Sequence, residues 1–365
     1  MSDVIVVGGG PAGACLAWLL GRRGLEVELL EQSRFPREKP CGEGLLPGGL
    51  EALRASGLAG RVGGEPLSGV RYHVADGGVR AAFREDAQGL GQKRLRLDAA
   101  LFAAAASVPG VRAREGARIE APVVERDRVV GVVVDGEVRR ARAVVAADGS
   151  SSTLRRALGL ERTAPARRVG IRAHFRLARP VGRDIQIFLR SGYELYVTPL
   201  PENEVLVAAL AHQDVVRGGL RQAFRGWLDG EPLLSGWLEG ATQTSELMGR
   251  APLVRRSGAP PPGLVLLGDA AESVDPVTAG GLSLAIASAT LLGRLLPDAL
   301  AGDDTALRRF ERARAAALCT HRWLGACLLG LARRPRLAKR TGELLQSCPR
   351  VLDALVGLAA RGVPR

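Results

Sequence analysis

Short apolar runs that stop at glycine or at an acidic residue recur in the N-terminal part of the chain. Residues 4–7 read VIVV and are followed by three glycines. Residues 25–30 are followed by Glu31, and residues 143–146 precede Asp148. Between the first two runs, residues 11–23 carry apolar side chains at helical spacing. Such runs are typical of strands in a parallel sheet that helices cover. We therefore predict a strand, a helix and a strand within residues 4–30.

The pattern changes to longer alternation of apolar and polar positions after residue 166. Residues 170–177, 184–190, 194–198 and 204–210 alternate, and residues 66–92 show a similar character with several glycines. Alternation indicates strands of a mixed or antiparallel sheet, and residues 216–228 have the pattern of an amphipathic helix. A buried strand at 264–267 and a helix at 280–296 then return the chain to the first sheet.

Charge is unevenly distributed and does not predict a nucleic-acid-binding protein. The formal net charge is +13, but residues 305–365 alone hold twelve arginines and one lysine against three acidic residues. The rest of the chain is close to neutral, aromatic residues make up 4% of the sequence, and no zinc finger or RNA-binding aromatic motif accompanies the basic segment. We expect no nucleic-acid partner.

The cysteines and the hydropathy profile indicate a cytoplasmic enzyme. Five cysteines, an odd number without CxxC spacing, argue against a disulfide framework and against a metal site. No uninterrupted apolar stretch of about 18 residues is present, so we expect no membrane-spanning helix.

The glycines after the first strand form a dinucleotide-binding fingerprint. Residues 8–13 read GGGPAG and satisfy G-x-G-x-x-G, with a strand before and a helix after, and Glu31 lies at the end of the second strand. In this motif the glycines allow a tight turn, close approach to a pyrophosphate and close helix–strand packing, while the acid binds a ribose. The predicted contacts are Gly8, Gly10, Pro11, Ala12, Gly13 and Glu31.

Two further motifs follow buried strands. Residues 148–155 read DGSSSTLR, and residues 268–271 read GDAA with Pro276 shortly after. Each places a carboxylate, Asp148 or Asp269, at the end of a strand, where ligands bind in open α/β sheets. Taken alone, each aspartate is equally well explained as a helix N-cap.

The three motifs in this order resemble the class A flavoprotein monooxygenases, the superfamily of para-hydroxybenzoate hydroxylase, with the geranylgeranyl reductases and flavin-dependent halogenases as relatives. The resemblance implies an α/β (α+β two-domain) fold: a Rossmann-like FAD-binding domain, an inserted mixed β-sheet substrate domain and C-terminal helices. The domains would comprise residues 1–65, 93–165 and 255–304 for FAD, 66–92 and 166–254 for substrate, and 305–365 as a basic helical segment.

The resemblance also implies roles for individual residues. Asp269 would bind the flavin ribityl chain, and the helix start at Gly280 and Gly281 would face the flavin ring. Asp148 and Arg155 would bridge FAD and the region where NAD(P)H docks as a transient reductant. The other implied cofactor contacts are Arg94, Cys41, Gly42, Gly268 and Pro276.

The loop at residues 39–47, KPCGEGLLP, bears on the kind of flavin chemistry. It resembles loops of geranylgeranyl reductases and bacterial lipid or polyketide hydroxylases, and with residues 193–199 it looks most like flavoprotein hydroxylases associated with type III polyketide synthases. A halogenase is disfavoured, because halogenases carry a lysine shortly after this loop and residues 48–92 contain none.

The resulting expectation is an FAD-dependent monooxygenase that hydroxylates an apolar aromatic, polyketide or phenolic-lipid substrate with NAD(P)H and O2, through a flavin C4a-hydroperoxide. His174 is the candidate base, with Tyr193 or Tyr196 as a hydrogen-bond relay, although His174 is also explained as a buried sheet histidine. The alternatives are an FAD-dependent reductase of prenyl double bonds and a non-catalytic flavin-binding protein.

The C-terminal segment allows two interpretations. Residues 323–332 are apolar and are followed by a basic run, RRPR, at 333–336. This is the composition of an interfacial helix that contacts a membrane surface, through which a lipid-like substrate would enter. It also fits a helical cap on the FAD domain with a solvated basic face.

Overall fold

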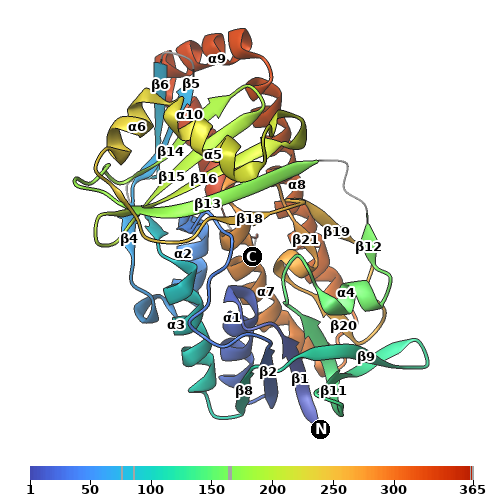
Figure 1. Ribbon diagram of the computed structural model, residues 1–365. Coiled ribbons are helices and arrows are strands. Elements are labelled where there is room, and N and C mark those ends of the chain that lie inside the picture. Colours follow the sequence, from blue (N-terminus) through green and yellow to red (C-terminus); the bar gives the residue numbers. More distant parts are fainter. Residues whose placement is uncertain (75–76, 85–86, 163–166, 362, 364–365) are drawn as a thin grey trace.

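The computed structural model describes residues 1–74, 77–84, 87–162, 167–361 and 363. It has a lower layer built on a sheet whose central strands are parallel and whose β9 and β10 edge is antiparallel, and an upper layer built on a larger mixed sheet (Figure 1). The expected boundary between residues 165 and 166 lies outside the described residues. The division into domains by residue number therefore stays a prediction.

The lower sheet has seven strands in the order β8-β2-β1-β11-β10-β9, with β20 also paired to β11. The strands are β1 (Ser2–Val7), β2 (Val27–Glu31), β8 (Val111–Glu115), β9 (Ile119–Glu125), β10 (Arg128–Val134), β11 (Glu137–Ala146) and β20 (Leu264–Leu266). The pairs β1–β2, β1–β11, β2–β8 and β11–β20 are parallel. The carboxyl ends of β1, β2, β11 and β20 therefore meet at one edge, where the three motifs begin.

Helices cover one face of this sheet. They are α1 (Pro11–Gly21), α3 (Arg94–Ala106) and α7 (Gly281–Leu300), and α2 (Pro47–Ala55) packs against α7. The largest hydrophobic core joins these helices to β1, β2 and β11. Strands β8 and β9 follow one another in the chain, which turns between them at Gly116, a residue with a φ of +70°.

The upper sheet has eight strands in the order β17-β13-β16-β15-β14-β5-β6, with β18 also paired to β13. They are β5 (Gly69–Val74), β6 (Gly77–Ala82), β13 (Arg168–Arg176), β14 (Asp184–Arg190), β15 (Tyr193–Leu200), β16 (Glu204–His212), β17 (Thr242–Gln243) and β18 (Met248–Arg250). Only β5 and β14 pair in parallel among the pairs described. Residues 66–92 thus contribute two strands to this mixed sheet, as expected.

The smaller elements connect the two layers. Strands β3 (Gly44–Leu45), β4 (Glu65–Leu67) and β7 (Gly89–Gly91) form one three-stranded sheet, and β12 (Glu161–Arg162), β19 (Arg255–Ser257) and β21 (Glu272–Ser273) form another. One α-helical turn and a half, α4 (Thr153–Ala157), follows β11. The 3₁₀ turns are η1 (Ala59–Arg61), η2 (Gln213–Val215), η3 (Gly268–Ala270) and η4 (Pro276–Thr278).

Each face of the upper sheet has its own helical cover. Helices α5 (Leu220–Asp229) and α6 (Pro232–Leu238) pack on one face through Phe224, Leu228 and Leu234. The other face receives α10 (Pro349–Ala360) through Leu352, Val356 and Ala360. The C-terminal segment is therefore part of the core of the upper layer, and not only a cap on the FAD domain.

The remaining C-terminal helices are α8 (Ala306–Ala332), which packs on α7, and α9 (Pro335–Ser347), which contacts β5 and β6. By length and composition, α7 and α8 could each cross a membrane. An apolar stretch of 18 residues in each helix is 61% buried within the protein in α7 and 33% buried in α8. Two such helices are weak evidence for a span, because the core helix of a soluble protein has the same composition. The basic segment thus forms three helices that run from the lower layer to the upper one (Figure 1).

Candidate functional site

A cavity of about 400 Å³ lies between the carboxyl edge of the lower sheet and the upper sheet. Of the residues expected to contact a cofactor, the lining contains Gly8, Gly10, Pro11, Ala12, Glu31, Cys41, Gly42, Arg94, Asp148, Gly268, Asp269, Pro276 and Gly281. Gly13, Arg155 and Gly280 lie behind this surface, since they do not line the cavity. Three motifs that are far apart in the sequence therefore converge on one space.

The glycine turn has the geometry that its sequence motif requires. Gly8 has a φ of +106°, and a Cβ atom on Gly13 would stand 1.8 Å from the Gly8 carbonyl oxygen. A Cβ on Gly10 would meet nothing closer than the guanidinium of Arg37, at 3.6 Å. Gly10 also precedes Pro11, the first residue of α1, and no side-chain hydrogen bond caps that helix. The backbone amides at its start are free to bind an anion.

Glu31 ties the glycine turn to the end of β2. Its Oε2 accepts a hydrogen bond from the Gly9 amide at 2.8 Å, and its Oε1 accepts one from the Ser33 amide at 2.9 Å. The side chain still lines the cavity. Because a carboxylate oxygen can accept a second hydrogen bond, these bonds leave Glu31 able to accept from a sugar hydroxyl.

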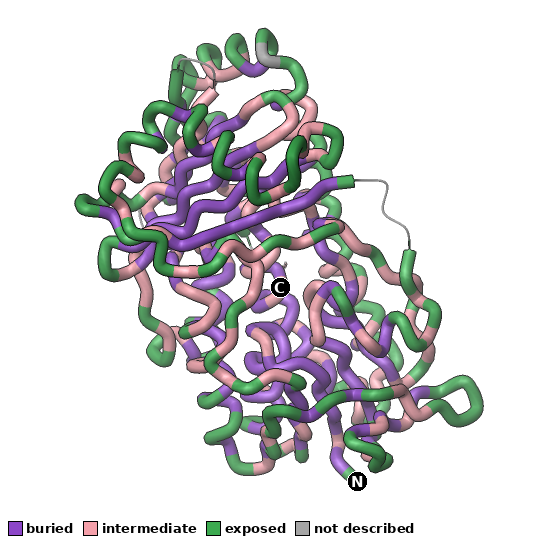
Figure 2. Tube along the Cα trace, viewed as in Figure 1, coloured by how far each residue is buried: buried purple, intermediate pink, exposed green. Residues whose placement is uncertain are grey.

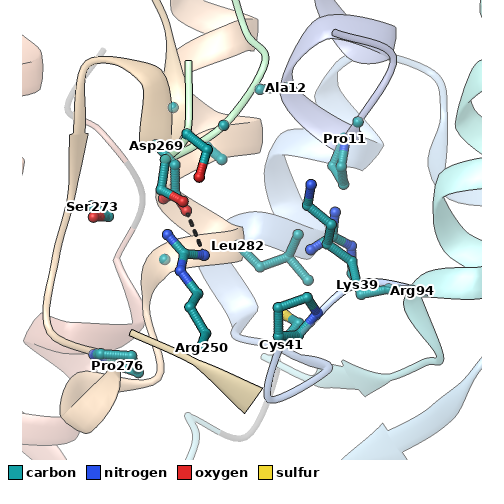
Figure 3. Close-up of a pocket in the computed structure, with 18 of the residues that line it drawn as sticks. Pro11, Ala12, Lys39, Cys41, Arg94, Arg250, Asp269, Ser273, Pro276 and Leu282 are labelled. Carbon is teal, nitrogen blue, oxygen red and sulfur yellow. Dashed lines mark ion pairs between the residues drawn. The ribbon is translucent and has the colours of Figure 1, made fainter. Parts of the chain in front are cut away.

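A cluster of cations faces the start of α1, and sequence reasoning found only Arg94 among its members. The fully buried Asp98 carboxylate pairs with Arg94 at 2.6 Å and with Arg37 at 2.8 Å. Burial alone would lower the pKa of Arg94, but Asp98 outweighs it and raises that pKa. The Nζ of Lys39 has no partner among the described residues; burial, then Arg37 and Arg94, lower its pKa. Figure 3 shows Lys39 and Arg94 together beside Pro11.

Asp148 and Arg155 play different parts at the end of β11. Asp148 Oδ2 accepts from the Thr153 amide at 2.8 Å, whereas its Oδ1 is buried and finds no partner among the described residues. Burial raises the pKa of Asp148, against the hydrogen bonds from Ser152 and Thr153. The side chain of Arg155 is wholly buried and donates to the carbonyls of Asp269 and Ala270. Arg155 therefore joins two motif loops, and the expectation that it meets FAD or NAD(P)H directly is corrected.

Asp269 reaches the opposite side of the cavity. Its carboxylate lies 3.7 Å from Nη1 of Arg250, a residue of β18 that was not predicted from the sequence (Figure 3). Arg250 Nη2 is buried without a hydrogen-bond partner in the described part of the chain. The pair therefore links the upper sheet to the GDAA loop across the space between the layers.

The loop of residues 274–281, which the resemblance implies faces the flavin and which we call the flavin-facing loop, closes the cavity beneath the upper sheet. Pro276, Ala279 and Gly281 line the space, and Ala279 has a φ of +53° before α7 begins. Tyr196 from β15 also lines it and donates its hydroxyl to the Val277 carbonyl at 3.0 Å. Burial raises the pKa of Tyr196 well above its usual value. Tyr196 is thus a neutral hydrogen-bond donor that is already engaged with this loop.

The other two candidate catalytic residues do not line the cavity. The ring of Tyr193 stacks on Trp227 at a centroid distance of 4.9 Å, on the α5 side of the upper sheet. Tyr193 and Tyr196 are three residues apart, so they point to opposite faces of the strand. The expectation that Tyr193 relays protons at the cavity is therefore corrected.

His174 lies behind the cavity wall, between two charged groups. Its Nδ1 is 3.1 Å from Nη1 of Arg172, and its Nε2 is 2.7 Å from Oε2 of Glu43. Because arginine can only donate, Nδ1 accepts, and Nε2 carries the proton that it gives to Glu43. Glu43 and Arg172 line the cavity in its place. The histidine is thus a buried sheet histidine that donates to Glu43 and does not itself line the cavity.

The part of the cavity next to the upper sheet is mainly apolar. Its lining side chains there are Ile171, Ile185, Ala208, Leu210, Met248 and Leu253, with Thr198, Arg172, Arg250 and Tyr196 as polar members. Thr198 donates to the Gly42 carbonyl at 2.8 Å, which fixes the loop of residues 39–47 against β15. The space is therefore polar at the glycine turn and apolar at the sheet.

The residues present fit FAD. The open position at Gly10 and the cluster of Arg37, Lys39 and Arg94 suit a diphosphate. The unpartnered Oδ1 of Asp148 suits a hydroxyl donor. The apolar half of the cavity suits the flat flavin ring, and the polar half at the glycine turn suits the dinucleotide tail.

Comparison with known proteins agrees with this assignment. Residues 1–190 match the FAD binding domain family. The 6-methylpretetramide 4-monooxygenase of Streptomyces rimosus is 30% identical over 349 residues, covering 84% of this chain and 78% of that one. Digeranylgeranylglycerophospholipid reductase 2 of Methanopyrus kandleri is 27% identical over 331 residues, covering 85% and 81%.

A solved structure and a longer relative complete the comparison. The structure of the myxobacterial chondrochloren halogenase CndH, an FAD-dependent halogenase, superposes with a TM-score of 0.77 at 26% identity, covering 86% of this chain and 79% of that one. Conditioned medium factor receptor 1 of Dictyostelium discoideum is 28% identical over 343 residues, 85% of this chain but 66% of that protein. This chain therefore spans slightly less than two thirds of that relative.

Proposed function

The chain belongs to the FAD-binding family of class A flavoprotein monooxygenases and related FAD-dependent oxidoreductases, and we propose that it hydroxylates an apolar aromatic, polyketide or phenolic-lipid substrate with O2 and NAD(P)H. The observation that carries the proposal is the apolar half of the cavity, which lies between the flavin-facing loop and the upper sheet. A similar monooxygenase is named for its substrate, 6-methylpretetramide.

The chain's own residues would bind and orient such a substrate. Bound FAD, reduced by NAD(P)H, would supply the oxygen chemistry. Arg172 presents a guanidinium to the cavity whose Nε is buried without a partner among the described residues, so it suits a phenol or carbonyl oxygen. Glu43, which lines the cavity with His174 behind it, is the carboxylate that we assign to accept a phenol proton. The apolar walls would exclude water from the reacting ring.

The reductase of prenyl double bonds is the second candidate, because a Methanopyrus reductase matches most of the chain. The halogenase stays disfavoured although a halogenase structure is similar. Halogenases carry a lysine shortly after the loop that corresponds to residues 39–47. In this chain Lys93 pairs with Glu204, and Lys39 faces the glycine turn. Neither stands at the apolar half of the cavity.

Isotopic labelling separates these activities. We expect incubation of the FAD-loaded enzyme with NAD(P)H, ¹⁸O2 and a panel of alkylated and prenylated phenols to give a product that carries one ¹⁸O atom. A reductase would instead give a saturated prenyl product without ¹⁸O, also under anaerobic conditions. If only the anaerobic product forms, the hydroxylase proposal is wrong. If no donor reduces the bound FAD, the protein is a non-catalytic flavin binder.

We further propose that the partner of the C-terminal helices is an anionic membrane surface. Exposed large apolar side chains gather there: Trp323, Leu337, Leu344, Val351 and Leu358. Exposed cations that form no salt bridge among the described residues lie in the same segment: Arg333, Arg334, Arg336, Lys339, Arg340, Arg350 and Arg361. Helix α9 is exposed along most of its length (Figure 2). Apolar residues flanked by cations favour an interfacial position on anionic lipid.

Vesicle flotation tests this contact with the full chain. We expect the protein to float with vesicles that contain anionic lipid, and the Leu337→Glu/Leu344→Glu variant to lose most of that binding, because both residues lie on one face of α9. Val124→Glu/Val138→Glu adds the same charge at exposed positions on the lower sheet and should not change flotation. Equal flotation of the two variants would overturn the membrane contact.

A further inference from the structure

The flavin-facing loop is held from the upper sheet by two contacts. Nε of Arg168, on β13, pairs with Oδ2 of Asp275 at 2.9 Å, and Tyr196 on β15 donates to the Val277 carbonyl at 3.0 Å. Both contacts come from strands whose other residues line the cavity. They fix the side of the loop that faces the upper sheet.

A third contact comes from the C-terminal segment, in which no sequence motif was found. His321, on α8, is almost fully buried, and its Nδ1 lies 3.0 Å from Oγ1 of Thr278. The same ring occupies the space beside Gly280: a Cβ atom on Gly280 would stand 2.1 Å from Cε1 of His321. Gly280 has a φ of −89° and a ψ of −11°, which alanine adopts without strain. The absence of a side chain at Gly280 is therefore explained by the ring and not by the backbone.

We propose that His321 is a positioning residue for the flavin site, through which α8 sets the place of Thr278 and Gly280 and so of the start of α7. Gly281 and Leu282, the first residues of α7, line the cavity. A helix start carries partial positive charge, which stabilises negative charge nearby. The position of this loop therefore controls how well the site holds the flavin and how strongly it favours the reduced, more anionic form.

The state of the histidine suits this role. Burial lowers the pKa of His321 to about 4, so the ring is neutral near pH 7. A neutral ring adds no charge beside the loop, and the field at the start of α7 comes from the helix itself. The inference uses only the FAD site and does not depend on which substrate is hydroxylated.

Four variants test the proposal. We expect His321→Ala to raise the FAD dissociation constant about tenfold and to lower the midpoint potential of bound FAD. His321→Asn places an amide near the position of Nδ1, so its FAD dissociation constant and midpoint potential should lie closer to those of the unchanged protein. Gly280→Ala should weaken FAD binding because its methyl group meets the ring, and adding His321→Ala to it should relieve that effect. His212→Ala, at a half-exposed histidine on β16, is the matched control.

The readouts separate positioning from general stability. FAD affinity comes from fluorescence titration, the midpoint potential from dye-coupled reduction, and the stability of the apo-proteins from thermal unfolding. A change in apo-protein stability with an unaltered midpoint potential would overturn the proposal. So would additive effects of Gly280→Ala and His321→Ala. If His321→Ala does not fold, His321→Asn still tests the effect on FAD affinity and midpoint potential. Comparison of the double variant with Gly280→Ala still tests whether removing the ring relieves the clash.

Discussion

Gly13→Ala is expected to yield a protein that retains no FAD. The added methyl group would lie 1.8 Å from the carbonyl oxygen of Gly8. That contact is with backbone, so α1 must move away from β1 and the phosphate cradle opens. Forced overpacking of this kind typically costs about 1–3 kcal/mol of unfolding free energy, and a clash with backbone lies at the upper end of that range. The ratio of flavin to protein absorbance after purification would measure the FAD content. Chemical denaturation would measure the loss of unfolding free energy.

The control for this substitution is Gly226→Ala on α5. No atom lies within 4 Å of the position where its Cβ would be built. Replacing glycine by alanine in a helix is expected to leave FAD content unchanged and to stabilise the protein by about 0.5–1 kcal/mol. A Gly13→Ala protein that purifies with full FAD would show that the turn does not hold the pyrophosphate.

Asp98→Asn should lower the unfolding free energy of the apo-protein by about 3–5 kcal/mol, the range for breaking a buried ion pair. The amide keeps the shape of the carboxylate but leaves Arg94 and Arg37, which are mostly buried, without their negative partner. Bound FAD brings a diphosphate to the same cations. Its addition should therefore recover part of the loss, which denaturation with and without FAD would measure.

Asp135→Asn is the matched control. Asp135 pairs with Arg114, and both side chains are about half exposed, 43% and 47%. Exposed pairs contribute roughly 0–1 kcal/mol, so this substitution should change little. Equal losses in the two variants would mean that Asp98 does not depend on its buried partners.

Local signals made the lower layer predictable. The glycine turn, Glu31, Asp148 and Asp269 lie at the carboxyl ends of mutually parallel strands of one sheet, and such ends share an edge. The predicted contacts therefore reached one cavity although they are widely spaced in the chain. Arg37 and Lys39 were missed because a basic residue in a loop rich in proline and glycine has no periodicity; their position in the loop after Glu31 was the only available signal.

Side-chain direction in the upper sheet was harder to predict. Strand parity separates Tyr193 from Tyr196 and could have been used. Parity does place His174 on the cavity face, together with Arg172. However, the loop that carries Glu43 covers the ring, and the path of that loop depends on contacts such as Thr198 with Gly42. The docking of α8 and α10 onto two separate layers is likewise set by long-range packing.

The pairing of β20 with β11 has a consequence for how the protein folds. Strands β1 and β2 with α1 are neighbours in sequence, so the phosphate cradle can form early, whereas Leu264 reaches Val144 only after the whole inserted sheet has been accommodated. Contacts between distant segments slow folding, because the loop must close before the contact contributes. Asp269, which follows β20, is thus the last of the motif residues to arrive. A ligand that contacts both the cradle and Asp269 would favour this late closure, so FAD should speed the final step of refolding as well as stabilise its product.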